Sequence, residues 1–380
     1  MIRAGRRRLL FGFAGAIGAG AATNGRAAAE PFDIRRYVYV PSATTPDVTV
    51  IDTETNRIAG TLRTGIVAGQ AAVSREAATL IATDARSASV SLVNVVTGAA
   101  RAVILPNPAE RLTIGTTGWL AGASYPAGGT IAVIDLGEER PDKVSTIRGL
   151  PPLRDAMFGD LDTTIYIAAE SLHGIGVVDV GKARLTREIV PVQPNPNGFA
   201  AMARSLNGRQ ILAMPPGGGP IGVFDPDRGQ PVGRVEATAG ATGMFPSGTG
   251  RYLLVPNSVE ATLAVFRSET IGDPVSLPGA AGVTSVYTAW LDSIAFMPSP
   301  AGHSVLVYDL DTMRRVDGIA LRGRPGQGAV TPDSRTLFLP VSDPPQVVAI
   351  DAATRKIAAV FDLPEPPLAA LVAGAWGVCH

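Results

Sequence analysis

A short apolar run that ends in Asp recurs along this chain, and its spacing constrains the fold more than any other feature. Clear copies end at Asp52 and Asp351. The eight end positions are Asp52, Asn94, Asp135, Asp179, Asp225, Arg267, Asp309 and Asp351, which are 41 to 46 residues apart. Units of nearly constant length predict a repeat architecture in which each unit is one supersecondary structure.

Each unit offers four short runs of β-branched and aromatic residues, bounded by Gly, Pro, Asp and Ser. In the last unit these runs are 328–331, 336–341, 346–351 and 356–361. No helical spacing is found, and four strands per unit of about 40–45 residues is the period of a propeller. The sequence therefore predicts an all-β, eight-bladed β-propeller of four-stranded antiparallel blades. Seven blades is the alternative, if one of the weaker units, 110–149 or 240–282, does not form a full sheet.

The first unit lacks one strand, and an additional strand-like segment follows the last unit. Residues 37–40, 48–52 and 57–62 are interpreted as the second, third and fourth strands of the first blade. A further apolar segment, 368–378, follows the last unit. We predict that this C-terminal segment supplies the missing strand, pairs with 37–40 and closes the ring, which removes the open sheet edges.

The N-terminus has the pattern of an export signal. Arg3, Arg6, Arg7 and Arg8 precede an apolar run at 9–22, which is too short to span a membrane as a helix. Ala27-Ala28-Ala29 is a small-residue cleavage site. We predict a signal peptide over 1–29, cleaved near Ala29, and a single propeller domain over 30–380 in the periplasm. The paired arginines resemble a twin-arginine (Tat) signal, although Gly5 and Leu9 depart from that pattern, so the Sec route stays open.

Removal of the signal changes the charge balance. The whole chain has 33 basic and 33 acidic residues, and residues 1–29 contain five arginines and no acid. Residues 30–380 therefore carry 28 basic and 33 acidic residues, which is not the charge pattern of a nucleic-acid-binding protein. We expect no membrane span in this mature part. The single Cys excludes an internal disulfide.

Several phrases of the repeat resemble a known family. Residues 37–42 with 48–53, and residues 330–339, look like the YVTN family of bacterial β-propeller repeats. That family is similar in fold to the haem-carrying propeller of periplasmic nitrite reductase and to the heavy chains of quinone-cofactor amine dehydrogenases. The resemblance implies an exported propeller, and the blade count favours the nitrite-reductase-like relatives. Those relatives are expected to offer a His to the haem, and no such motif is matched here, so the cofactor stays unknown.

Polar residues at the beginning of first strands are the best candidates for a binding site. In a propeller these positions surround the mouth of the central channel. They are Gln70, Arg111, Arg154, Asp155, Asn197, Arg324 and Gln327. Three arginines from separate blades could converge on an anionic ligand through charge-assisted hydrogen bonds. The alternative is that all of them are ordinary loop residues that face solvent.

The possible metal ligands are few. His173 and His303 both fall in loops between second and third strands, so they share a face, but their blades are not adjacent. Cys379 and His380 end the chain and are expected on the opposite face, where they could bind a soft metal or, as we favour, pack beneath the ring. A shared site would need its ligands about 2 Å from one ion, so no metal site is predicted.

Catalytic signatures are weak. No G-x-S-x-G occurs, and three dispersed histidines do not favour a Ser-His-Asp triad. We therefore predict a non-catalytic binding or accessory protein, whose partner is a periplasmic redox protein or an anionic small molecule. Two alternatives stay open, namely an enzyme of lactonase or lyase type and a scaffold subunit of a periplasmic dehydrogenase.

Overall fold

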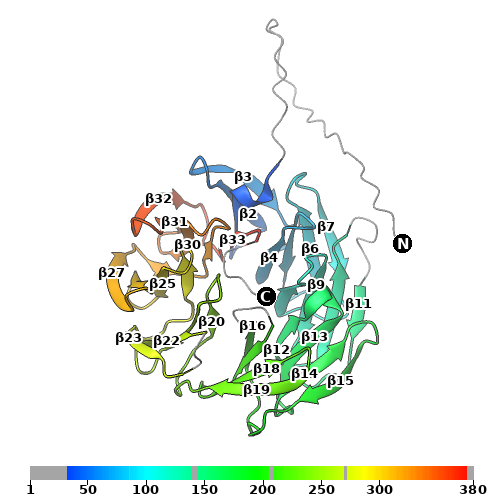
Figure 1. Ribbon diagram of the computed structural model, residues 1–380. Coiled ribbons are helices and arrows are strands. Elements are labelled where there is room, and N and C mark those ends of the chain that lie inside the picture. The colour runs from blue at the N-terminus through cyan, green and yellow to red at the C-terminus, as the bar shows by residue number, and fades with distance from the viewer. Residues whose placement is uncertain (1–31, 85, 138–143, 205–208, 269–271, 375–380) are drawn as a thin grey trace, which may run out of the picture. The chain divides into compact units, whose positions relative to one another are not determined.

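The repeat folds into a ring of small sheets. The structure is a computed structural model that describes residues 32–84, 86–137, 144–204, 209–268 and 272–374. Within these residues the chain forms eight antiparallel sheets, which are arranged about one axis as the blades of a propeller (Figure 1). All eight belong to one unit of the chain, Asp33–His380. The predicted all-β, eight-bladed fold is confirmed.

The strands of each blade run in order from the ring axis outward. Blade 1 contains β33 (Leu371–Val372), β1 (Tyr37–Pro41), β2 (Asp47–Asp52) and β3 (Arg57–Arg63), and blade 2 contains β4 (Gln70–Ser74), β5 (Thr79–Thr83), β6 (Ser89–Asn94) and β7 (Ala100–Ile104). Blade 3 contains β8 (Arg111–Ile114), β9 (Leu120–Tyr125), β10 (Thr130–Asp135) and β11 (Val144–Ile147), and blade 4 contains β12 (Leu153–Phe158), β13 (Thr164–Ala169), β14 (Ile175–Asp179) and β15 (Arg184–Ile189).

The second half of the ring repeats this order. Blade 5 contains β16 (Ala201–Arg204), β17 (Ile211–Met214), β18 (Ile221–Asp225) and β19 (Gln230–Val235), and blade 6 contains β20 (Phe245–Pro246), β21 (Tyr252–Asn257), β22 (Thr262–Arg267) and β23 (Val275–Pro278). Blade 7 contains β24 (Tyr287–Ala289), β25 (Ile294–Ser299), β26 (Ser304–Asp309) and β27 (Arg314–Ala320), and blade 8 contains β28 (Arg324–Pro325), β29 (Ala329–Val330), β30 (Thr336–Ser342), β31 (Gln346–Asp351) and β32 (Lys356–Asp362). Two short 3-10 helices, η1 (Ile34–Arg36) and η2 (Asp160–Asp162), complete the described elements.

The two weaker units both form sheets, so the seven-blade alternative is wrong. Blade 3 pairs β8, β9, β10 and β11 in order, and blade 6 does the same with β20 to β23. The inner strand of blade 6 is short, since β20 consists of Phe245–Pro246 alone. In blade 8 the inner strand is split, because β28 and β29 each pair with a different part of β30.

The C-terminal segment closes the ring as predicted. β33 pairs antiparallel with β1, with Val38 opposite Val372 and Tyr39 opposite Leu371. A parallel bridge between Gln327 and Ala369 joins the same segment to blade 8. Blade 1 is therefore built from both ends of the described chain (Figure 1).

The core lies between blades. Middle strands such as β5 and β30 are buried along nearly their whole length, whereas the outer strands β3 and β27 are mostly exposed. A strand that is covered on both faces is apolar along its whole length, which explains the sequences of the middle strands. Each apolar cluster joins neighbouring blades: one combines Val38 and Ile51 of blade 1 with Phe338 and Val347 of blade 8.

The recurring Asp has a local role. At the end of the third strand its carboxylate accepts a hydrogen bond from a backbone N–H two or three residues further on, which shapes the turn to the fourth strand. Examples are Asp225 with the N–H of Arg228 at 2.9 Å and Asp309 with that of Thr312 at 2.7 Å. The same turn occurs at Asp52, Asn94, Asp135, Asp179 and Asp351.

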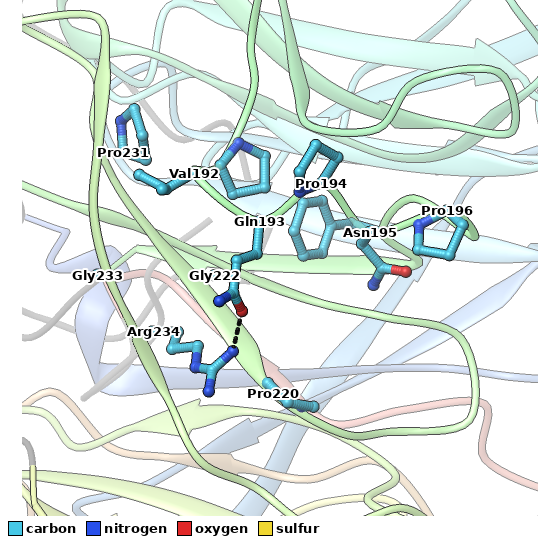
Figure 2. Close-up of a pocket in the computed structure, with 12 residues that line it drawn as sticks. Val192, Gln193, Pro194, Asn195, Pro196, Pro220, Gly222, Pro231, Gly233 and Arg234 are labelled. Atoms are coloured by element: carbon cyan, nitrogen blue, oxygen red, sulfur yellow. Dashed lines mark hydrogen bonds between the residues drawn. The ribbon is translucent and has the colours of Figure 1, made fainter.

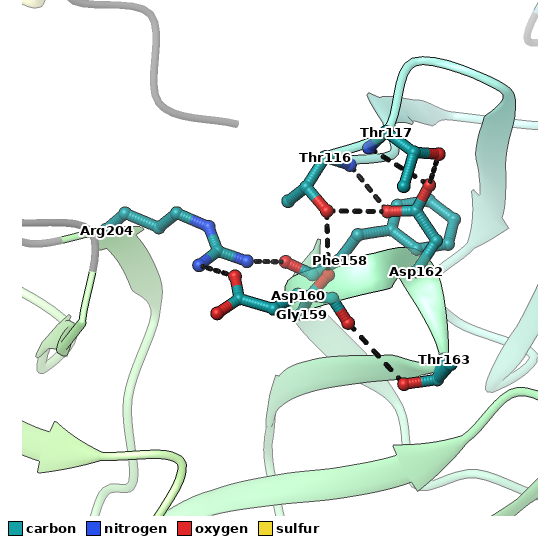
Figure 3. A network of polar contacts seen from close by, with 8 residues as sticks. All are labelled: Thr116, Thr117, Phe158, Gly159, Asp160, Asp162, Thr163 and Arg204. Atoms are coloured by element: carbon teal, nitrogen blue, oxygen red, sulfur yellow. Dashed lines mark hydrogen bonds and ion pairs between the residues drawn. The ribbon is translucent and has the colours of Figure 1, made fainter.

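The turns between first and second strands hold neighbouring blades together. Asp162 of blade 4 is 4% exposed and accepts hydrogen bonds from the backbone N–H groups of Thr116 and Thr117 in blade 3, at 2.5 and 3.2 Å, and from both hydroxyl groups (Figure 3). Blade 7 repeats the arrangement, since the buried Asp292 accepts hydrogen bonds from the N–H and hydroxyl of Thr249 in blade 6. A buried carboxylate therefore joins these blades on the face opposite the predicted binding residues.

The same network continues into blade 5. Arg204 is 8% exposed and donates hydrogen bonds to the carboxylate of Asp160 at 2.8 Å and to the carbonyl of Phe158 at 2.6 Å (Figure 3). Blades 3, 4 and 5 are therefore linked by one chain of polar contacts. Charge-assisted hydrogen bonds of this kind are among the stronger ones in proteins.

Candidate ligand-binding site at the channel mouth

Polar side chains from three successive blades meet where the inner strands begin, at the end of the ring axis that we call the mouth. Gln70 and Arg111 begin β4 and β8, and Asp155 lies near the beginning of β12. All three line one cavity of about 130 Å³, together with Ser124 from the end of β9. A space of that size holds a few water molecules or one small polar group, since a water molecule occupies about 30 Å³ of liquid.

The three side chains are held by the neighbouring blade. The side-chain oxygen of Gln70 accepts a hydrogen bond from the N–H of Leu112 at 2.8 Å. The guanidinium Nη1 of Arg111 lies 3.7 Å from the carboxylate Oδ1 of Asp155. This is an ion pair without close hydrogen-bond geometry, and the Arg111 side chain stays 51% exposed. Arg111 can therefore turn its donors toward a ligand without losing a strong partner.

Asp155 is the partly buried carboxylate of the site, with its side chain 23% exposed. Its carboxylate accepts hydrogen bonds from the N–H of Met202 in blade 5 at 2.7 Å and from that of Ala156 at 2.9 Å. The part of the side chain that remains accessible opens on the cavity which it lines. Burial raises the pKa of the Asp155 carboxyl, and the N–H of Met202 and the charge of Arg111 only partly offset this effect.

Arg154 points to the next blade. Its Nη1 donates a hydrogen bond to the carbonyl of Asn197 at 2.6 Å. Asn197 belongs to the connection between blades 4 and 5 and is exposed. Two of the predicted residues thus contact each other, but through the backbone of Asn197 rather than its side chain.

The predicted residues of blade 8 lie apart from this group. Arg324 is exposed on β28, opposite Ser342. The carbonyl of Gln327 accepts a hydrogen bond from the N–H of Ala370 at 2.9 Å, which anchors the closing segment. The structure therefore brings Gln70, Arg111 and Asp155 together at one cavity and joins Arg154 to Asn197 in a separate contact. Arg324 and Gln327 lie in blade 8, on the other side of blade 1. Of the three arginines that were expected to converge, Arg111 lines this cavity.

The two described histidines do not form a site. His173 lies in the loop between β13 and β14, and His303 between β25 and β26, which are in blades 4 and 7. Among the residues that the structure describes, no group of three His, Cys, Asp or Glu is placed to hold a metal ion. Cys379 and His380 lie outside the described residues.

The lining residue Ser124 was not among the predicted ones. Ser124 is 5% exposed and lines the cavity from a second strand, whereas the sequence reasoning considered only first strands. Its place opposite Arg111 in the register of β8 and β9 is the signal that could have found it.

The chain was compared with known proteins. No family model matches it, and no curated protein matches it either. Among solved structures it is similar to the dihydro-haem d1 dehydrogenase NirN in complex with DHE, with 14% identity and a TM-score of 0.73 over 93% of this chain and 78% of that one. It is also similar to apo AztD from Citrobacter koseri, with 12% identity and a TM-score of 0.69 over 90% and 98% of the two chains. Hydrazine synthase of Kuenenia stuttgartiensis follows, with 15% identity and a TM-score of 0.54 over 77% and 95%.

The fold is what these proteins share with this chain. At such identities the likeness does not assign a ligand, and the similarity to YVTN repeats rests on the sequence phrases alone. Among the described residues there is no helix long and apolar enough to cross a membrane.

The raised pKa of Asp155 gives a stability prediction. Below the pKa of about 3.9 of an unfolded Asp, both states bind the proton and the group has no effect. As pH rises above that value, the unfolded chain releases its proton first, so the folded state loses stability until the folded pKa is passed. Asp155→Asn, which removes this titration, should therefore become more stable relative to wild type between pH 4 and pH 7. Urea unfolding at both pH values measures this, and a difference that does not change with pH would contradict it.

Proposed function

We propose that this chain is an exported β-propeller which binds a small anion at its mouth as a non-catalytic binding or accessory protein. The observation that carries the proposal is the cavity shared by Gln70, Arg111 and Asp155 from three successive blades. Arg111 supplies positive charge to it, and the side chains of Gln70 and Asp155 accept hydrogen bonds from backbone N–H groups that hold them in place. Groups held in this way present a fixed surface to a ligand and lose little freedom when it binds.

A redox system is the setting that we favour for this role. Two of the structural neighbours are a dehydrogenase of dihydro-haem d1 and a hydrazine synthase. The YVTN-like phrases and the export pattern of residues 1–29 are consistent with an accessory protein of the periplasm. The partner would be a periplasmic redox protein or the anionic small molecule that it uses.

Export makes a prediction of its own. Residues 1–29 lie outside the described residues, and β1 begins the propeller only at Tyr37. We expect the protein recovered from the periplasm to begin at Glu30. Intact-mass spectrometry of the periplasmic fraction checks this, and a periplasmic protein that retains Met1 would contradict it. A variant with Arg6 and Arg7 replaced by Lys distinguishes the twin-arginine route, which it should block, from the Sec route.

Anion binding is tested directly by calorimetric titration of the full mature chain with phosphate, sulfate and acetate. A hydrogen bond to a charged group contributes about 1.5–3 kcal/mol, and about 1.4 kcal/mol corresponds to a tenfold change in Kd. Arg111→Gln should therefore weaken binding by about tenfold or more. The matched control is Arg314→Gln, which changes an exposed arginine on the outer strand of blade 7 and should leave binding unchanged.

The pH dependence sharpens this test. Protonation of Asp155 removes the negative charge beside Arg111, so binding of sulfate, which keeps its own charge, should strengthen as pH falls and should lose most of this dependence in Asp155→Asn. Anions that bind Arg111→Gln as tightly as wild type would overturn the site.

A further inference from the structure

A second cavity lies away from the mouth, on the outer side of blade 5. It is a groove of about 620 Å³ between the outer strands β18 and β19 and the loop 190–200, which connects blades 4 and 5 (Figure 2). The lining residues that matter here are Val192, Gln193, Pro194, Phe199, Gly233 and Arg234. Pockets of roughly 300–1,000 Å³ with mostly apolar walls and a few polar groups are typical of small-molecule sites.

The loop 190–200 forms one wall of this groove. It runs from the end of β15 at Ile189 to the start of β16 at Ala201, and it is the longest of the blade-to-blade connections in the described part of the chain. Pro191, Pro194 and Pro196 fix the backbone φ angle at three positions, which limits the conformations open to the loop. Its inner end is held by the hydrogen bond from Arg154 to Asn197, and its outer end by the one from Arg234 to Gln193.

The walls are rigid and apolar. Five prolines, at 191, 194, 196, 220 and 231, line the groove, and a proline ring loses no rotamer freedom on binding. Phe199 is 2% exposed and packs edge-on against Phe224 with ring centroids 5.6 Å apart, which fixes the inner wall. Flat, preorganised walls suit a planar apolar group better than a flexible chain.

One charged group faces the groove. Arg234 donates a hydrogen bond to Gln193 through Nη1 (Figure 2) and forms an ion pair with Glu236 through Nε. A guanidinium has five N–H donors, so two further donors on Nη2 can bind a ligand. Its planar fork is matched to carboxylate and sulfonate groups.

We propose that this groove binds a small molecule with a planar apolar body and one anionic group, at a site separate from the mouth. The apolar body lies between the proline rings of the loop and the strands of blade 5, and the anionic group accepts hydrogen bonds from Arg234. The loop 190–200 links the two sites, because Arg154 at the mouth holds its inner end.

The test uses anilinonaphthalene sulfonate, an aromatic anion whose fluorescence rises in apolar sites, with the full mature chain. Saturable binding to wild type should weaken at least tenfold in Gly233→Trp and in Arg234→Gln. A Cβ added at Gly233, which lines the groove, meets no atom within 4 Å, so a larger side chain can start from this position toward the groove. If Gly233→Trp does not fold, as judged by its thermal melt, Arg234→Gln decides the test.

The chain offers a matched control. Gly60 occupies the same register position in blade 1, opposite Val50 as Gly233 is opposite Val223, and a Cβ there also meets no atom within 4 Å. Gly60→Trp should bind the dye like wild type, and so should Arg314→Gln, which changes an exposed arginine on the outer strand of blade 7. The proposal is overturned if wild type shows no saturable binding, if Arg234→Gln binds like wild type, or if Gly60→Trp weakens binding as much as Gly233→Trp.

Discussion

A chain that ends at Pro366 is expected to lose its soluble fold. The truncation removes β33 and takes Ala370, Val372 and Ala373, all of them buried, out of the contact between blades 8, 1 and 2. It also removes the hydrogen bonds from Leu368 to Pro41 and from Ala370 to Gln327. Burial of one valine side chain contributes about 1.5–3 kcal/mol, so the total loss of about 5 kcal/mol is comparable with the stability of a whole domain.

The matched control for this truncation ends at Gly374 and keeps β33. Soluble yield and melting temperature of both chains, compared with the full mature chain, give the answer. The chain that ends at Gly374 should remain soluble, whereas the shorter one exposes the edge of β1 and should aggregate. Equal yields and equal melting temperatures would show that the ring does not depend on β33.

Asp162→Ala is expected to destabilise the protein by about 3 kcal/mol or more. The carboxylate accepts hydrogen bonds from two backbone N–H groups and two hydroxyls of Thr116 and Thr117 in the neighbouring blade. The four donors are partly buried, so each one that is left without a partner costs about 1 kcal/mol, the lower end of the range for such groups. Chemical unfolding measures the loss. Asp162→Asn keeps one acceptor oxygen and should lie between wild type and Asp162→Ala.

Asp227→Ala is the control for this change, because Asp227 is exposed in the turn between β18 and β19. It should alter the free energy of unfolding by less than about 0.5 kcal/mol, as surface substitutions usually do. If Asp162→Ala were as stable as Asp227→Ala, the turns between first and second strands would not hold the blades together.

The fold was predictable because the residues that form each turn are close together in the sequence and recur in most units. The recurring Asp, at positions such as Asp225 and Asp309, marks the same turn in successive units, and its hydrogen bond needs only the next three residues. The spare C-terminal segment and the incomplete first blade together indicated the closure, since an open sheet edge has to find a partner. The short inner strands were less predictable, because only two residues of β20 complete the ladder of blade 6.

The candidate site was predictable in part. Gln70, Arg111 and Arg154 lie about one repeat apart in the sequence, so their places in successive blades follow from the repeat itself. The repeat spacing also places Arg324 in blade 8, away from Gln70, Arg111 and Arg154. Their role in binding a ligand stays a prediction.

Contacts between blades could not be predicted. Asp162 bonds to Thr116 across 46 residues, and no local pattern marks either residue. The groove under the loop 190–200 likewise could not be predicted. Its size is set by the distance between the loop and blade 5, and the prolines in the sequence do not determine that distance.

Anion binding at the mouth is the central claim, and anomalous diffraction from crystals of the mature chain soaked in sodium bromide tests it most directly. We predict a bromide peak within the cavity lined by Gln70, Arg111 and Asp155, with higher occupancy at pH 4 than at pH 7. Bromide peaks that occur only at exposed arginines on outer strands, with none in that cavity at either pH, would contradict the claim.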